Sequence, residues 1–206
     1  MEFRDLARRY EYLWHVTYAG AWPSIREWGF WPAADLLQRA GYADRVGVFR
    51  DVSMPLALDD GLRVTIRDQV RARRDVSGSL DGVDEAGWWS LINARVYFFA
   101  REEHAEVLRD KYVTRGEPQD VIKIRTRGLE DQVPSIEVTT ANAGMFPRKV
   151  GRSRGLDTFV GLSDFDEREA NRIREVTVRG RARVDDASVI SVVRHDAEGT
   201  QRRVFP

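Results

Sequence analysis

The sequence lacks cysteine and contains little histidine, and each shortage excludes a class of protein. Because no cysteine occurs among the 206 residues, a disulfide scaffold, a thiolate zinc site and a cysteine nucleophile are all excluded. The three histidines, His15, His104 and His195, are too few and too scattered along the chain to predict a metal site. We therefore expect a protein without a metal cofactor.

Long hydrophobic runs and an excess of charge of one sign are also missing. No stretch approaches the roughly 18 consecutive apolar residues of a membrane-spanning helix, and residues 1–10 lack the apolar core of a signal peptide. The 33 basic residues balance 33 acidic ones, which argues against a protein that coats nucleic acid or membranes through its overall charge. We expect a cytoplasmic protein with no membrane contact.

Lysine is scarce among the basic residues. Lys111, Lys123 and Lys149 are the three lysines, so thirty of the 33 basic residues are arginine. This excess is consistent either with a GC-rich genome or with binding of phosphate and carboxylate groups, which the planar guanidinium recognises well.

One part of the C-terminal half is locally basic. Residues 145–155 contain no acid and include Arg148, Arg152 and Arg154. Such a segment suits contact with a phosphate backbone, and a solvated surface is the alternative.

The pattern of hydrophobic residues predicts one α+β domain that spans residues 1–206. Hydrophobic residues make up 42% of the chain, enough to build a core. Helices are expected in the first half, at residues 1–10, 21–29, 33–40, 85–93 and 102–112. Strands are expected at 12–18, 95–99, 121–126, 136–139, 174–178 and 189–194, with 62–68 as a strand or an ordered loop. This order favours a largely antiparallel sheet, with a split sheet as one option, over a Rossmann fold.

Several polar side chains on the expected strands could carry chemistry, and each also has a structural interpretation. His15 and Thr17 share one face of the first strand and could bind one polar ligand, or His15 could be a structural histidine. Glu175 could point into a cleft or lie at an exposed sheet edge. Arg67 could contact a pyrophosphate or form a salt bridge with its neighbours.

The expected strand at 95–99 carries two aromatic residues and an arginine on one face. Arg95, Tyr97 and Phe99 could form a stacking platform for an adenine or nicotinamide ring. The alternative is that the aromatic residues belong to the hydrophobic core.

The order of the motifs resembles that of DarT-like ADP-ribosyltransferases, and most closely an uncharacterised DarT-related family. The opening His-x-Thr strand is followed by a helix with a Ser-Ile pair and a Gly-Phe end, and the C-terminal strand carries a glutamate. These motifs read Leu13-Trp14-His15-Val16-Thr17, Trp22-Pro23-Ser24-Ile25, Gly29-Phe30, Arg67-Asp68-Gln69, Arg95-Val96-Tyr97-Phe98-Phe99, Asn142-Ala143-Gly144 and Arg174-Glu175-Val176-Thr177-Val178. The resemblance covers roughly residues 12–195.

The resemblance implies an ADP-ribosyltransferase fold in which NAD, as co-substrate, lies in a cleft between two half-sheets. It implies that Glu175 is the catalytic carboxylate and that His15 and Thr17 grip the NAD. Arg67 would be the catalytic or phosphate-binding arginine, with Arg50 as the alternative. Three further side chains are candidates for cofactor contact: Ser24, Arg95 and Tyr97.

The resemblance also implies an acceptor and a biological class. We expect ADP-ribosylation of a nucleic acid base, with DNA favoured, and contact with the acceptor through Arg148, Arg152 and Arg154. DarT-like enzymes are often toxins with a cognate antitoxin. Residues 100–103 read Ala-Arg-Glu-Glu, where DarT has a Pro-Arg-x-Pro-Met type of stretch, so acceptors of protein, RNA or small-molecule type remain alternatives, as does a non-catalytic NAD- or nucleotide-binding module.

Overall fold

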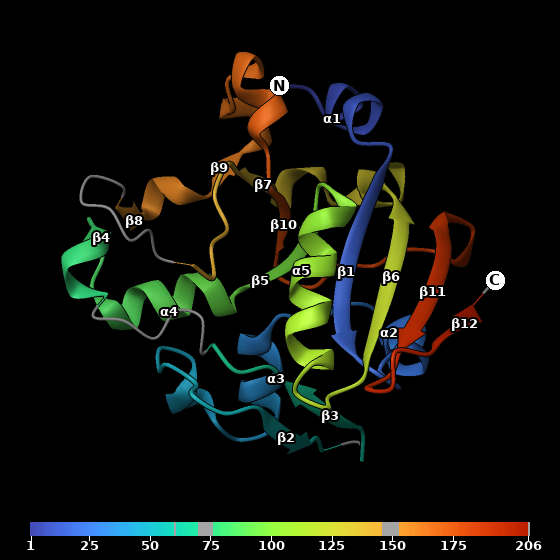
Figure 1. Ribbon diagram of the computed structural model, residues 1–206. Coiled ribbons are helices and arrows are strands. Elements are labelled where there is room, and N and C mark those ends of the chain that lie inside the picture. Colours follow the sequence, from blue (N-terminus) through green and yellow to red (C-terminus); the bar gives the residue numbers. More distant parts are fainter. Residues whose placement is uncertain (60, 70–75, 146–152, 206) are drawn as a thin grey trace.

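A computed structural model describes residues 1–59, 61–69, 76–145 and 153–205 (Figure 1). Its centre is an eight-stranded antiparallel sheet with the strand order β12-β11-β6-β1-β5-β10-β7-β9. The strands are β1 (Tyr12–Tyr18), β5 (Arg95–Phe99), β6 (Gln119–Arg125), β7 (Ile136–Thr139), β9 (Val160–Gly161), β10 (Glu175–Arg179), β11 (Val189–His195) and β12 (Gln201–Phe205). The chain therefore has the expected α+β class.

The sheet is continuous, but its two central strands barely meet. β1 pairs with β6 along its whole length, and β10 pairs with β5 from Glu175 to Arg179. In contrast, β1 meets β5 at a single register position, Trp14 opposite Phe99. Two four-stranded halves, β12-β11-β6-β1 and β5-β10-β7-β9, are thus joined at one point and separate beyond it. We call this junction the seam.

The two faces of the sheet are covered by different helices. On one face, α5 (Glu102–Val113) packs on the central strands through Ala105, which lies against Val16 and Phe99. The other face carries the main hydrophobic core, where Leu13 and Phe98 pack with residues of α1 (Phe3–Arg9) and α2 (Trp22–Trp28). Alternation along β1 explains this division, because neighbouring side chains of a strand point to opposite faces.

Two smaller cores extend the domain beside the sheet. The helix α3 (Ala33–Arg39) packs through Leu37 on the hairpin of β2 (Met54–Ala57) and β3 (Arg63–Ile66). The helix α4 (Glu85–Asn93) buries Trp88 and Trp89 near Phe159, and Asp84 caps its first turn by accepting a 2.7 Å hydrogen bond from the Gly87 amide. A short parallel pair joins β4 (Leu80–Asp81) to β8 (Arg154–Gly155).

A glycine sets the path of the chain after α2. Gly29 ends this helix with a φ of +83°, and a Cβ there would lie 2.6 Å from the carbonyl oxygen of Ala182. Glycine is the residue that tolerates both conditions. The next residue, Phe30, pairs with Ala182 in an isolated bridge, which fixes the connection between α2 and α3 close to the seam.

Most expected elements are present, and some strands were missed. The predicted strands 12–18, 95–99 and 136–139 and the helix 85–93 have the observed bounds, and every described α-helix ends by Val113. The prediction that 189–194 is the last strand is wrong, because β12 follows it and forms one edge of the sheet. β2, β4, β8 and β9 were also missed. Within the described residues, no helix is both long and apolar enough to cross a membrane.

Candidate functional site

A cavity of about 500 Å³ lies at the seam of the sheet and extends toward α2, α3 and the β2–β3 hairpin. This volume is typical of a small-molecule site. Seven residues that the sequence singled out line it: His15, Thr17, Ser24, Arg67, Arg95, Tyr97 and Glu175. The alternative arginine, Arg50, lines it as well. Residues from both halves of the sheet therefore meet at one cavity.

Glu175 is a buried carboxylate inside the sheet. It begins β10, which lies between β5 and β7, and it is only 4% exposed. The alternative of an exposed edge position is therefore wrong. Its Oε2 accepts a 3.0 Å hydrogen bond from the Ala143 amide. Burial raises the pKa of Glu175 to about 7, although the Ala143 amide, Arg174 and Arg154 act to lower it. Near neutral pH this group can take up or release a proton.

His15 bridges the seam from the other half of the sheet. Its Nδ1 lies 2.9 Å from the carbonyl oxygen of Tyr97 on β5. Since a carbonyl only accepts, we assign the proton to Nδ1, which leaves Nε2 as an acceptor. Burial lowers the pKa of His15 to about 4, and the nearby charge of Arg67 acts in the same direction. The ring packs edge-on against Phe30, with centroids 4.9 Å apart, so at neutral pH it is an uncharged, fixed acceptor.

Two hydroxyl groups line the cavity near His15. Thr17 follows it on the same face of β1. Ser24, in the first turn of α2, donates from Oγ to the Ala21 carbonyl at 2.8 Å, and its oxygen keeps the capacity to accept. Both residues line the same cavity as His15.

Arg67 is held in place by the backbone and by aromatic rings. Its Nη2 donates to the Val16 carbonyl at 3.2 Å and to Oε1 of Gln119 at 2.6 Å. The guanidinium carbon lies 4.4 Å from the ring centroid of Tyr112 and 5.3 Å from that of Tyr18. Contacts of a guanidinium with aromatic rings are favourable. The side chain thus reaches the cavity from the loop after β3.

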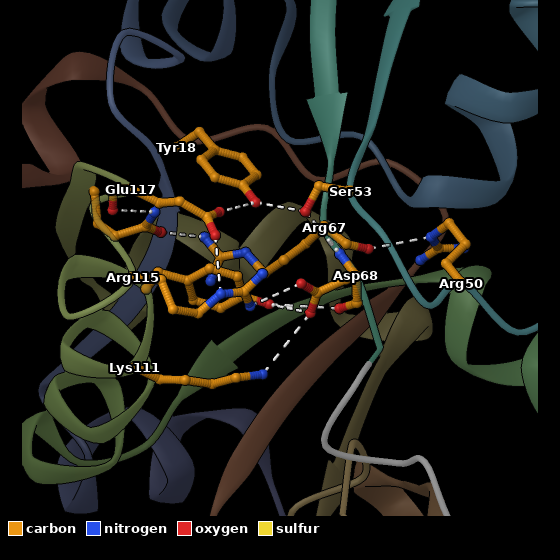
Figure 2. A network of polar contacts seen from close by, with 10 residues as sticks. Tyr18, Arg50, Ser53, Arg67, Asp68, Lys111, Arg115 and Glu117 are labelled. Carbon is orange, nitrogen blue, oxygen red and sulfur yellow. Dashed lines mark hydrogen bonds and ion pairs between the residues drawn. The ribbon is translucent and has the colours of Figure 1, made fainter.

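Asp68 forms ion pairs with basic side chains beside this loop, as Figure 2 shows. Its carboxylate accepts from the Tyr112 hydroxyl at 2.9 Å and from Nη1 of Arg115 at 2.8 Å, and Nζ of Lys111 lies 3.8 Å away. Burial alone would raise the pKa of Asp68, but these partners lower it. Among the described residues, Arg67 forms no salt bridge with its neighbours in the triplet, and the ion-pair partners of Asp68 are Lys111 on α5 and Arg115 in the turn after it.

Arg50 lies against the same loop. Its Nε donates to the Arg67 carbonyl at 3.1 Å, its backbone amide donates to Oε1 of Gln69 at 2.9 Å, and its carbonyl accepts from the Gln69 amide at 2.7 Å. Burial lowers the pKa of Arg50 to about 10, so the group is still charged at neutral pH. The two candidate arginines are therefore neighbours.

Arg95 and Tyr97 line the cavity with polar groups that already have partners. Arg95 forms a two-pronged ion pair with Glu137, at 2.7 and 3.1 Å, and donates to the Leu91 carbonyl at 2.6 Å. The Tyr97 hydroxyl donates to the Ile92 carbonyl at 3.1 Å. The guanidinium of Arg95 also lies 4.1 Å from the ring centroid of Phe159. These contacts show that both residues also support the fold.

The basic segment can be placed only in part. Arg148 and Arg152 lie outside the described residues. Arg154 is on β8, where its Nη2 donates to the Met145 carbonyl at 3.2 Å. Together with Arg174 it is near enough to lower the pKa of Glu175. Arg154 does not line the cavity itself.

Some contributors to the site gave no signal in the sequence. Tyr112 and Gln119 look like an ordinary helix residue and an ordinary strand residue. The packing of α5 on the sheet brings Tyr112 to Arg67, and the pairing of β6 with β1 brings Gln119 there. Ala143 acts through its backbone amide, which side-chain chemistry cannot reveal. Within the described part of the chain, no three His, Cys, Asp or Glu side chains gather as a metal site would require.

Comparison with known proteins supplies a family. No curated protein matches the chain. Residues 11–190 match DUF7002, a family of unknown function. This range begins just before β1 and ends on β11, so it contains the seam, the cavity and the residues discussed above. The match covers most of the chain, and the protein therefore belongs to the DUF7002 family.

Proposed function

We propose that the protein is an NAD-dependent ADP-ribosyltransferase that modifies a base in nucleic acid, with DNA the favoured acceptor. One observation carries the proposal: Glu175 and His15 come from different halves of the sheet and line the same cavity at the seam. The motif resemblance leads us to expect NAD between two half-sheets, with a glutamate and a His-x-Thr pair in contact with it. The separation of β1 from β5 beyond Trp14 supports that arrangement.

Glu175 has the chemistry that the reaction needs. Cleavage of the bond between nicotinamide and the ribose C1′ develops positive charge on the sugar, as in glycoside cleavage. A carboxylate beside the sugar stabilises this charge, most strongly in a buried site. Nicotinamide leaves with the bonding electron pair, the acceptor atom bonds to C1′, and the Glu175 carboxylate accepts the proton that the acceptor loses. A pKa of about 7 suits a group that must accept a proton near neutral pH.

His15 suits the recognition of a sugar. Because Nδ1 is occupied by the Tyr97 carbonyl, Nε2 can accept a hydrogen bond from a hydroxyl group of the ligand. Thr17 can donate or accept beside it. Neither residue carries charge at neutral pH, so we propose that both orient the ligand. Glu175 stabilises the positive charge on the sugar, and the arginines bind the phosphate groups.

The acceptor is proposed from charge near the site. Arg154 and Arg174 lie near Glu175, and the segment that contains Arg148 and Arg152 precedes Arg154 in the chain. Arginine binds phosphate oxygens well, and a base must leave its stack to reach a buried carboxylate. A single-stranded or flipped base is therefore the proposed acceptor.

The test is incubation of the protein with NAD and single-stranded oligonucleotides, followed by mass spectrometry. We expect an ADP-ribose mass increment on the oligonucleotide. Glu175→Gln keeps the size of the side chain and removes its charge, so we expect the rate to fall by a factor of about 10² or more. Glu106→Gln, a half-exposed position on α5, is the matched control and should modify the oligonucleotide at the wild-type rate.

Two results would count against the proposal. Modification by Glu175→Gln at the wild-type rate would reject the catalytic assignment. Binding of NAD without nicotinamide release, across DNA, RNA and protein acceptors, would favour a non-catalytic nucleotide-binding module instead.

A further inference from the structure

Two neighbouring arginines in the cavity wall have unused hydrogen-bond donors. Toward other described residues, the side chain of Arg50 donates only through Nε and that of Arg67 only through Nη2. Nη1 of each is buried and without a partner in the described part of the chain. Arg50 as a whole is 8% exposed. Buried charged donors without partners are rare in folded proteins, and a ligand is one physical explanation for them.

Among the described residues of the network around the two arginines, cations outnumber carboxylates. Asp68 and Glu117 are the carboxylates of the network in Figure 2, and Arg50, Arg67, Lys111 and Arg115 are its cations. Asp68 is bound by Arg115 and Lys111, and Glu117 by Arg115 at 3.0 Å and by the Tyr18 hydroxyl at 2.8 Å. The carboxylates are thus satisfied by the outer cations. Asp68 acts on the charges of both arginines from a distance, but in the described part of the chain neither carboxylate forms an ion pair with Arg50 or Arg67, which line the cavity.

We propose that Arg50 and Arg67 together form a single dianion site that binds the diphosphate group of a dinucleotide. Two guanidiniums with free N–H groups match two phosphate groups that carry one negative charge each. The inference rests on the proposed function in one respect, because that function identifies the ligand as a dinucleotide. The resemblance offered Arg67 or Arg50 as the phosphate-binding arginine, and we propose that both residues bind the diphosphate.

The backbone explains why the two side chains act as a unit. The segment that carries Arg50 is bonded to Gln69 through both its amide and its carbonyl, and Nε of Arg50 holds the carbonyl of Arg67. Arg67 is fixed by Gln119 and by the carbonyl of Val16 on β1. These contacts fix the backbone of residue 67 against the side chain of Arg50, and both arginines line the same cavity.

The test is titration calorimetry with ADP-ribose, inorganic diphosphate and inorganic phosphate. ADP-ribose contains the diphosphate without nicotinamide, so its binding does not depend on catalysis. We compare wild type with Arg50→Met, which keeps an unbranched apolar side chain and removes the guanidinium with its charge. Arg45→Met, five residues away and exposed, is the matched control. We expect ADP-ribose and inorganic diphosphate to bind at least about tenfold more weakly to Arg50→Met and unchanged to Arg45→Met.

Thermal unfolding separates a binding role from a structural one. Removal of an unpaired buried cation should raise the melting temperature of the ligand-free protein, and it should reduce the increase that ADP-ribose produces in wild type. If Arg50 had only a structural role, Arg50→Met would lower the melting temperature of the ligand-free protein, and the increase produced by ADP-ribose would be unchanged. Arg50→Lys, which keeps the charge, should recover part of the ligand effect.

The outcomes also separate this inference from the proposed function. Wild-type affinity of Arg50→Met for ADP-ribose, or binding of inorganic phosphate without binding of diphosphate, would overturn the dianion site. NAD cleavage could still occur in that case. Diphosphate binding that depends on Arg50, in a protein that releases no nicotinamide, would support the site and reject the transferase.

Discussion

The Nδ1 atom of His15 lies 2.9 Å from the carbonyl oxygen of Tyr97 and joins the two halves of the sheet through a side chain. This contact lies one residue beyond Trp14, where the backbone of β1 pairs with β5 at its single register position. The imidazole therefore occupies the place where the next backbone pairing would be expected. It keeps the seam together while the strands separate, and the cavity opens beside it.

The buried, uncharged state of His15 predicts a dependence of stability on pH. Its folded pKa of about 4 lies below the ordinary 6.5, so the unfolded chain binds more protons between these values. The contribution of uncharged His15 to the free energy of unfolding is complete above pH 6.5, and it is lost as the pH falls toward 4. We expect it to be about 2 kcal/mol smaller near pH 5 than near pH 7.

The measurement is urea unfolding of wild type and His15→Asn near both pH values. Asparagine can still donate a hydrogen bond to the Tyr97 carbonyl and does not titrate. The stability difference between the two proteins should shrink at the lower pH. An equal difference at both pH values would show that His15 is not held neutral by the fold.

The ionisation of Glu175 predicts the pH profile of the proposed reaction. Burial raises the pKa of this carboxyl to about 7, and only the ionised form can stabilise the sugar cation and accept a proton. The value of kcat/KM for nicotinamide release should level off above pH 7. It should fall about tenfold per pH unit well below this value.

His15 does not titrate in this range, since its pKa is about 4, so a single ionisation should describe the acid limb. The profile is measured from pH 5.5 to 9 with NAD well below saturation. A rate that is constant across the whole range would contradict the role assigned to Glu175.

The ion pair between Arg95 and Glu137 predicts a stability effect without a matching effect on binding. Both side chains are largely buried, with exposures of 6% and 15%, and Glu137 supplies both carboxylate oxygens. Glu137→Gln leaves the Arg95 charge without its partner, and we expect it to lower the free energy of unfolding by about 3–5 kcal/mol.

Arg95→Met with Glu137→Leu removes both charges and should recover much of that loss. Chemical denaturation measures both variants, and ADP-ribose affinity is measured on the double variant. A large loss of affinity in the stable double variant would instead support the cofactor-binding role predicted for Arg95.

Local patterns predicted much of the fold because they depend on neighbouring residues. The run 12–18 is rich in aromatic and β-branched residues, and its alternation defines β1 at the observed bounds. The edge strand β12 was missed since Gln201, Arg202 and Arg203 are polar and exposed. Such a strand exists because β11 offers a partner, and a tertiary partner leaves no trace in the local pattern.

The order of motifs singled out residues that line one cavity, but it did not predict how they are held there. Nothing in the sequence shows that β1 meets β5 at one position, that Ala143 donates to Glu175, or that Arg50 lies beside Arg67. These relationships join segments that are 17 to more than 80 residues apart. They follow from sheet order, which residue chemistry alone does not determine.

The most direct test of the account is a crystal structure of Glu175→Gln with NAD. The variant keeps the shape of the site and should slow the cleavage of the ligand. We predict electron density for NAD at the seam, with the nicotinamide ribose between residue 175 and His15 and the diphosphate against Arg50 and Arg67. NAD bound away from this cavity, or with its ribose distant from residue 175, would contradict the central claim.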